Sequence, residues 1–276
     1  MAHNNVPSFL RFEFGGNWKN FLKHLNNARI QEAEESLAQK TGLPALQGKT
    51  FLDVGCGSGL FSLAARNMGA KVRSFDYDKN SVACALELKN RFHNGDPDWI
   101  IERGSALDRN YIAALGKYDI VYSWGVLHHT GNMYAALENI IKVVKDNGML
   151  FIAIYNDQGG KSRRWRAFKK FYVSAPKPVK LLMALFVIVR FNCVTVIKRL
   201  MSFKSPLPPQ ERGMHLWHNA VDWAGGYPFE VARPEEIFEF CKTRGFTLLK
   251  LTTRDLGCNE YVFIKTAPQA GPFGAV

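Results

Sequence analysis

The sequence has few cysteines, and no two of them are closely spaced. The five are scattered over 276 residues without a CxxC motif: Cys56, Cys84, Cys193, Cys241 and Cys258. A structural zinc site or a disulfide framework needs regularly spaced cysteines, usually in even number. The sequence therefore argues against both and predicts a protein of a reducing compartment, the cytoplasm.

Long apolar segments are missing as well. The first nine residues do not combine a basic start with an apolar stretch, so no secretion signal is expected. The apolar run from Leu181 to Val189 is shorter than the roughly 20 residues that a membrane-spanning helix needs, and Arg190 follows it directly. No spanning helix is expected, and the length suits one α/β domain with additions.

Acidic residues are absent from one long stretch. Between Lys161 and Lys204 there are twelve Lys or Arg residues and no Asp or Glu. The remainder holds 24 basic and 24 acidic residues, so this stretch carries the whole net charge of +12. A local excess of this kind predicts a local anionic partner, which is a membrane, a nucleic acid or a phosphorylated substrate.

Short apolar runs alternate with helical patterns over the middle of the chain. Strands are expected at 50–54, 71–75, 99–103, 118–123 and 149–155, with helices at 60–68, 81–92 and 134–144. A further helix at 234–244 precedes strands at 246–252 and 261–265, which we expect to pair antiparallel. The predicted fold class is α/β, with a Rossmann-like, seven-stranded, mostly parallel sheet and helices on both faces.

Composition divides the chain into five expected segments. An N-terminal helical cap (1–48) precedes the Rossmann-like core (49–156), and a basic, aromatic cap insertion follows (157–230). A C-terminal helix and strand pair (231–266) completes the core, and a small-residue tail (267–276) ends the chain. The helical insertion therefore interrupts the core just before its last helix.

A glycine-rich loop follows the first expected strand, with the sequence DVGCGSG at 53–59. Glycines at 55, 57 and 59 allow a sharp turn and close approach to a ligand. The spacing is GxGxG rather than the GxGxxG of dinucleotide enzymes, and the Asp53 carboxylate would repel a phosphate. Taken alone, the glycine loop has a tight turn without a ligand as its alternative interpretation. Together with Asp53, the loop indicates a ligand that carries an amino group, namely S-adenosylmethionine.

A second acidic position supports this ligand. Asp76 ends the second strand, where a carboxylate can accept hydrogen bonds from both ribose hydroxyls. Tyr77 follows it and can pack against the adenine face.

Residues 51–155 resemble the class I S-adenosylmethionine-dependent methyltransferase superfamily, in particular the branch with ubiquinone and menaquinone methyltransferases. The matching motifs are the 53–59 loop, Asp76, GSA at 104–106, YDIVYSWGVLHH at 118–129 and the closing strand from Gly257. These motifs are specific for the cofactor and the reaction type. They contain little information about the substrate.

The resemblance implies roles for individual residues. Gly55, Cys56, Gly57 and Gly59 would lie under the methionine part, with Asp53 near its amino group. Asp76 would bind the ribose, and Tyr77, Ser105 and Ala106 the adenine, while Ser123 and Trp124 would border the sulfonium and the acceptor. O-methylating relatives often carry acidic metal ligands near 125–129, and Gly125 offers none, so no metal is predicted.

Methyl transfer is a displacement at a sulfonium, and a base is needed only when the acceptor must lose a proton. His128 and His129 follow the fourth strand and are the candidate catalytic residues, with packing or capping as the alternative. Trp18, His218 and Tyr227 are the candidate acceptor-binding residues. The alternative for the aromatic segment around 214–230 is a lid that packs on the sheet.

The basic stretch 161–204 permits three interpretations: a lid buried over the active site, a helix in a membrane interface, or a nucleic-acid surface. Its apolar centre fits RNA poorly. The predicted function is an S-adenosylmethionine-dependent methyltransferase that methylates oxygen on a small-molecule, sugar or lipid-linked acceptor. It would be cytoplasmic, with or without peripheral membrane association. An RNA methyltransferase and a non-catalytic cofactor-binding protein are the alternatives.

Overall fold

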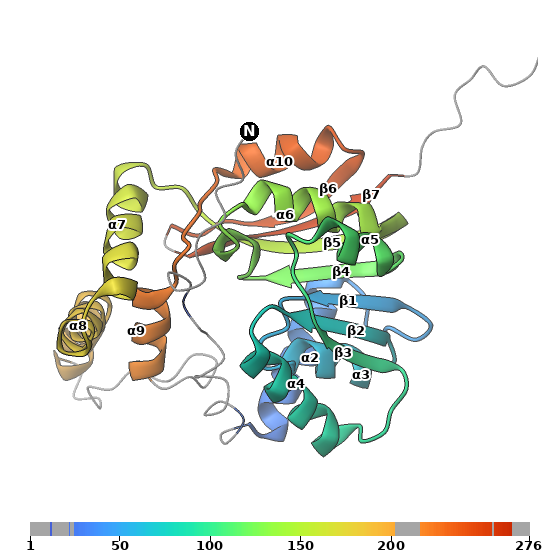
Figure 1. Ribbon diagram of the computed structural model, residues 1–276, viewed down its shortest axis with the longest axis horizontal. Helices are drawn as coiled ribbons and strands as arrows, with labels where there is room; N and C mark the ends of the chain where they lie inside the picture. Colours follow the sequence, from blue (N-terminus) through green and yellow to red (C-terminus); the bar gives the residue numbers. More distant parts are fainter. Residues whose placement is uncertain (1–11, 13–21, 23–24, 202–215, 256, 267–276) are drawn as a thin grey trace, which may run out of the picture.

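A seven-stranded sheet forms the centre of the computed structural model, which describes residues 12, 22, 25–201, 216–255 and 257–266. Its order is β3-β2-β1-β4-β5-β7-β6 (Figure 1). The strands are β1 (Thr50–Val54), β2 (Lys71–Asp76), β3 (Trp99–Arg103), β4 (Tyr118–Trp124), β5 (Val144–Tyr155), β6 (Phe246–Thr252) and β7 (Cys258–Lys265). β1 to β5 run parallel, and β7 runs antiparallel between β5 and β6. The predicted fold class is confirmed.

Two layers of helices cover the sheet. One holds α2 (Asn27–Thr41), α3 (Leu60–Asn67) and α4 (Lys79–Phe92), and the other α5 (Arg109–Ala114), α6 (Met133–Ile140) and α10 (Pro234–Lys242). Alternate strand residues enter the two cores: Phe51 and Tyr122 face the α2 layer, and Leu52 and Val121 face the α6 layer. This period of two is what a strand buried on both faces requires.

The structure departs from the predicted element boundaries between β3 and β5. A helix that the pattern did not predict, α5, begins after Asp108, whose carboxylate accepts hydrogen bonds from the amides of Asn110 and Tyr111. α6 ends at Ile140, η3 (Ile141–Val143) follows, and β5 begins at Val144 rather than Met149. The turn-like DNG sequence at 146–148 lies within the strand, because a register shift against β4 accommodates Asn147 at φ 60.

The insertion after β5 is helical, as predicted. It contains α7 (Gly160–Ser174), α8 (Lys177–Met201) and α9 (Leu216–Gly225), which gather to one side of the sheet (Figure 1). Aromatic rings hold them together: Trp165 stacks on Phe191 at 5.6 Å and contacts Trp223 at 4.4 Å, measured between ring centroids. Within the described part of the chain, no helix is long and apolar enough to cross a membrane.

Candidate active site

The glycine loop between β1 and α3 adopts a conformation that other residues rarely take. Gly55, Gly57 and Gly59 have φ values of 75, 55 and 83, in the left-handed region. A Cβ on Gly55 would overlap the Val126 side chain, and one on Gly59 would lie 2.9 Å from Ala85 Cβ. The loop therefore needs glycine for both its backbone conformation and its packing, and Val126 holds the segment after β4 against it.

Asp53 presents a buried carboxylate at the end of β1. The Ser62 hydroxyl donates to it at 2.5 Å, the Ser74 hydroxyl donates to Ser62 at 2.7 Å, and the Trp99 indole donates to Ser74 at 3.0 Å. Burial raises the pKa of Asp53 to about 7, and the nearby charge of Asp76 adds to this. The hydrogen-bonded chain orients the carboxylate, and Ser62, Ser74 and Trp99 are residues that sequence reasoning missed.

Asp76 joins the end of β2 to the glycine loop. One carboxylate oxygen accepts from the Gly57 amide at 2.9 Å, and the other accepts from the Asp78 amide at 2.8 Å. Burial raises the pKa of Asp76 to about 6. The next residue, Tyr77, is exposed, and the Arg103 guanidinium lies 5.6 Å from its ring centroid. The loop, both carboxylates and the exposed ring are thus gathered at the carboxyl ends of β1 and β2.

Four other predicted cofactor residues have structural contacts of their own. Burial raises the pKa of the Cys56 thiol well above its usual range. The Ser105 hydroxyl accepts from the Leu107 amide at 3.2 Å, and the Ala106 carbonyl accepts from Asn139 at 2.9 Å. The fully buried Ser123 donates to the Val54 carbonyl at 3.1 Å, which ties β4 to β1. Their contacts with a cofactor stay predictions.

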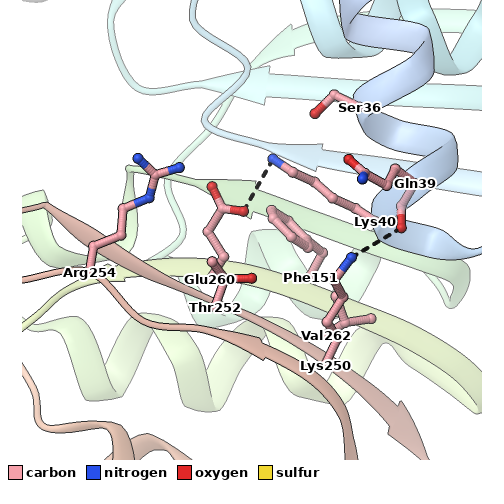
Figure 2. A pocket seen from close by; sticks show the side chains of 9 residues that line it. All are labelled: Ser36, Gln39, Lys40, Phe151, Lys250, Thr252, Arg254, Glu260 and Val262. Carbon is pink, nitrogen blue, oxygen red and sulfur yellow. Dashed lines mark hydrogen bonds and ion pairs between the residues drawn. The ribbon is translucent and has the colours of Figure 1, made fainter.

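Trp124, at the end of β4, points toward β7. Its indole donates to Glu260 at 2.9 Å, and Glu260 also pairs with Lys40 of α2 at 3.4 Å. These last two residues line a hollow of about 350 Å³ on the α2 side of the sheet (Figure 2). No predicted site residue lines this hollow, so it is separate from the glycine loop and the histidines.

The two histidines lie in η2 (Leu127–His129), beside the end of β5. The Tyr155 amide donates to His128 Nδ1 at 3.4 Å, and the two side-chain rings are 4.1 Å apart. His129 Nδ1 lies 2.7 Å from the Pro228 carbonyl, which can only accept, so Nδ1 carries the proton. Burial lowers the pKa of His129 to about 3 and that of His128 well below its usual value. Both imidazoles are therefore neutral near pH 7.

His128 has an unused polar atom. Its side chain is fully buried, and its Nε2 has no hydrogen-bond partner among the described residues. The ring also forms a backbone hydrogen bond with Ala153, which raises its pKa and offsets part of the effect of burial. A buried polar atom without a partner is costly, so Nε2 is suited to contact a bound molecule.

A lysine from the basic insertion completes the cluster. Lys169 of α7 is fully buried, and its ammonium donates to the Trp223 carbonyl. Its Nζ lies 3.6 Å from the Trp223 ring centroid and 5.1 Å from that of Phe229. Burial lowers the pKa of Lys169 well below its usual value, and its charge adds to the low pKa of both histidines. Sequence reasoning counted Lys169 only as one cation of the block, although it shares the buried stripe of α7 with Tyr172.

The predicted acceptor residues are only partly within the described chain. Tyr227 is buried, and its carbonyl accepts from the Phe12 amide at 3.0 Å. A Cβ on the preceding Gly226 would lie 2.9 Å from His129 Cε1, so this segment packs directly on the histidines. His218 lies in α9, but its side chain is outside the described residues, as is all of Trp18.

Glu230, also in this segment, has a structural contact. Its carboxylate accepts from the Met133 amide at 3.1 Å, at the start of α6. In the part of the chain that the structure describes, no three His, Cys, Asp or Glu side chains gather where they would hold a metal ion. The absence of a metal stays a prediction.

Residues 21–188 match the family model of the methyltransferase domain, which is more than half of the chain. The chain belongs to the methyltransferase domain family. This confirms the predicted membership of the class I S-adenosylmethionine-dependent methyltransferases and, with it, the predicted enzyme class and cofactor.

Relatives of this methyltransferase differ in what they act on. A ubiquinone biosynthesis O-methyltransferase of Glaesserella parasuis is 29% identical over 111 residues, which cover 40% of this chain and 47% of the relative. A ribosomal protein L11 methyltransferase of Helicobacter hepaticus is 42% identical over 76 residues, covering 28% and 23%. The matches to the ubiquinone enzymes thus span about half of their length. The identity of the acceptor does not follow from them.

The fold agrees with the family. The crystal structure of magnesium protoporphyrin IX methyltransferase from Synechocystis PCC 6803 superposes with a TM-score of 0.52 at 16% identity. The superposition covers 86% of this chain and 83% of that chain. The superposition therefore extends over much of the chain and is not limited to the region of the glycine loop.

Proposed function

We propose that this methyltransferase transfers a methyl group to a hydroxyl oxygen of a small or lipid-linked acceptor. The observation that carries the proposal is a cluster beside the end of β5, in which the buried His128 and Lys169 lie with the half-buried His129. Val126 packs against Gly55 of the glycine loop and lies two residues before His128. The cluster and the loop are therefore neighbours across the carboxyl end of the sheet, where α/β folds bind ligands.

The residues of the loop fit S-adenosylmethionine. The glycine backbone leaves space that a side chain would fill, Asp53 suits the amino group, and Asp76 suits the ribose hydroxyls. When bound, this cofactor supplies a methyl group on a sulfonium. The protein then has to bring the acceptor oxygen into line, exclude water and accept one proton.

His129 is the proton acceptor in this proposal. Because its Nδ1 proton is held by the Pro228 carbonyl, its Nε2 carries the lone pair. When the acceptor oxygen takes the methyl group that S-adenosylmethionine would supply, the hydroxyl proton would move to His129 Nε2. Burial lowers the pKa of His129 in the free protein, so its imidazole is unprotonated near pH 7 and has a lone pair that can accept a proton.

His128 contacts the acceptor in the same scheme, since its buried Nε2 lacks a partner among the described residues. The names of several relatives, which are ubiquinone biosynthesis O-methyltransferases, support transfer to oxygen. The relative that acts on ribosomal protein L11 matches over a shorter segment. The basic block keeps RNA as the principal alternative acceptor.

One experiment separates these acceptor classes. The protein is incubated with cell extract and S-adenosylmethionine that is labelled on the methyl group, and the products are divided into organic, RNA and small-metabolite fractions. We expect label in the organic or small-metabolite fraction, and we expect it to be stable to mild base, which releases the methyl group of an ester but not that of an ether. Label confined to RNA, or absent from every fraction, would refute the proposed acceptor.

The role of His129 is tested by His129→Asn. The asparagine amide can still donate to the Pro228 carbonyl but has no atom at the position of Nε2. We expect kcat to fall by about 10²-fold or more, as for loss of a general base, with cofactor affinity unchanged. The control is His93→Asn, because His93 pairs with Asp96 at the end of α4. Equal activity in the two variants would remove His129 from the mechanism.

A further inference from the structure

We propose that the outer face of α8, together with the cations of α7, docks on the surface of an anionic lipid bilayer. We call this surface the α8 face and define it by its exposed apolar side chains: Phe171, Leu181, Leu182, Leu185, Phe186 and Val189. Docking on lipid goes beyond the methyl transfer proposed above and does not depend on it. The inference rests on the arrangement of apolar and charged side chains along these two helices.

The apolar side chains of α8 form one stripe. Positions 181, 182, 185, 186 and 189 repeat at helical spacing, and each of these side chains is between 45% and 65% exposed. Ala184 and Val187 on the opposite side are at most 2% exposed, and Val187 belongs to the apolar cluster of the cap. One apolar side of the helix therefore packs in the fold, and the other is exposed to solvent. Such a continuous exposed stripe differs from single leucines scattered over a surface.

Exposed cations accompany this stripe on the same two helices. Exposed Lys and Arg side chains precede it on α7, at positions 161, 163, 164, 166 and 170, and flank it on α8 at Lys177 and Arg190. No Asp or Glu occurs between residues 161 and 204. A helix with an apolar stripe bordered by cations is the type that lies in a membrane interface, where the cations meet anionic headgroups.

The charge also distinguishes lipid from the other occupants. A second copy of the chain would bring two equally cationic faces together, and their repulsion opposes a symmetric dimer through this surface. RNA would satisfy the charges, but the stripe is mostly aliphatic and offers bases little to stack on. An anionic bilayer satisfies both the charge and the apolar area. It would also place α7, which carries Lys169, next to the lipid.

Vesicle flotation tests the docking. The full chain is mixed with vesicles of phosphatidylcholine alone or of phosphatidylcholine with phosphatidylglycerol. We expect flotation only with the anionic vesicles, weakened by salt, and at least tenfold weaker binding for Leu182→Gln/Val189→Gln. The matched control is Leu249→Gln/Leu251→Gln, which removes two exposed leucines from β6. The control is expected to float like the wild type.

Each contrary result identifies another answer. Failure of the wild type to float, or equal loss in the control variant, would overturn docking through the α8 face. A Leu182→Gln/Val189→Gln variant that changes from dimer to monomer in light scattering would assign the face to a second copy instead. Salt-sensitive retention of RNA without flotation would assign the basic block to nucleic acid. Thermal unfolding of each variant identifies loss of fold, and none of these measurements requires an active methyltransferase.

Discussion

The glycine loop and the histidine cluster lie at the same end of the sheet but are built in opposite ways. The loop is continuous in sequence, 53–59, and needs one distant carboxylate, Asp76. The cluster brings together η2, the end of β5, α7 and the segment after α9. A site made of consecutive residues depends on backbone conformation, whereas one assembled from distant elements depends on burial and tertiary packing.

The electrostatics of the two regions also differ. In the loop, burial raises the pKa of two carboxyl groups, Asp53 and Asp76. In the cluster, burial lowers the pKa of the bases His128, His129 and Lys169. In both regions, burial shifts each pKa toward the uncharged form of the group. The loop is prepared for a cationic ligand and the cluster for an oxygen that carries or develops negative charge.

The largest expected effect is that of Gly55→Ala, which tests the dependence of the loop on its backbone. A Cβ at Gly55 meets the Val126 side chain and φ is 75, whereas Gly42 has φ 71 and open space. We expect Gly42→Ala to cost about 1 kcal/mol for the left-handed conformation and Gly55→Ala about 3 kcal/mol, with the overlap added. Denaturant unfolding measures both, and calorimetry should show loss of cofactor binding only for Gly55→Ala.

A second substitution separates strain from overlap. Adding Val126→Ala to Gly55→Ala removes the two colliding methyl groups but leaves the positive φ and a Cβ–Cβ distance of 2.9 Å. Part of the lost stability should therefore return, and the remaining loss should exceed that of Gly42→Ala. If Gly55→Ala and Gly42→Ala lost the same free energy of unfolding, the close packing at Gly55 would have no energetic consequence.

The next effect concerns the cluster and its buried lysine. The pKa of Lys169 is well below its usual value in the folded chain, whereas unfolding restores a value of about 10.4. Between these two pKa values the unfolded chain binds one proton more, so stability rises with pH by up to about 1.4 kcal/mol per pH unit. Lys169→Met removes this contribution. Denaturant unfolding between pH 8 and pH 10 measures the difference.

Lys170→Met provides the control, because the neighbouring Lys170 is exposed. Its pH dependence should match that of the wild type. If Lys169→Met showed the same slope as Lys170→Met, Lys169 would not titrate as a buried group, and the contrast between the loop and the cluster would lose its main support.

The smallest effect is proton release at the loop. The free protein holds protons on Asp53 below a pKa of about 7 and on Asp76 below about 6. A cofactor amino group and ribose hydroxyls favour the ionised carboxylates, so binding releases protons and affinity rises as pH increases to about 7. The rise is at most about tenfold per pH unit for each proton released. Calorimetry in two buffers of different ionisation enthalpy counts the protons, and Asp53→Asn should remove the component nearest pH 7. If binding released no proton, both carboxylates would already be ionised in the free protein.

The positions of most strands, the glycine loop and Asp76 were predictable because each is coded locally. Alternation of apolar runs defines buried strands, and the short spacing from Asp53 to Gly59 leaves little conformational choice. The boundaries around β5 were less accessible, since the start of that strand at Val144 depends on a register shift against β4. α5 was missed because its six residues are few for a periodic pattern, and its N-cap, Asp108, was the only local signal.

The roles of charged residues in the insertion required the tertiary structure. Composition placed Lys169 among twelve equivalent cations, and only the packing of α7 against α9 buries it while its neighbours stay exposed. Glu230 accepts a hydrogen bond from the amide of Met133 at the start of α6, a contact between segments far apart in the sequence.

The sequence alone determined the class of fold, the family and the cofactor loop, since periodicity and glycine conformation act over a few residues. The tertiary structure decided which histidine nitrogen carries a proton, which lysine is buried and which side of α8 faces solvent. Those properties depend on partners far away in the chain, such as Pro228 for His129 and Trp223 for Lys169. The residues that neighbour His129 or Lys169 in the sequence do not indicate which distant group will bond to it or bury it.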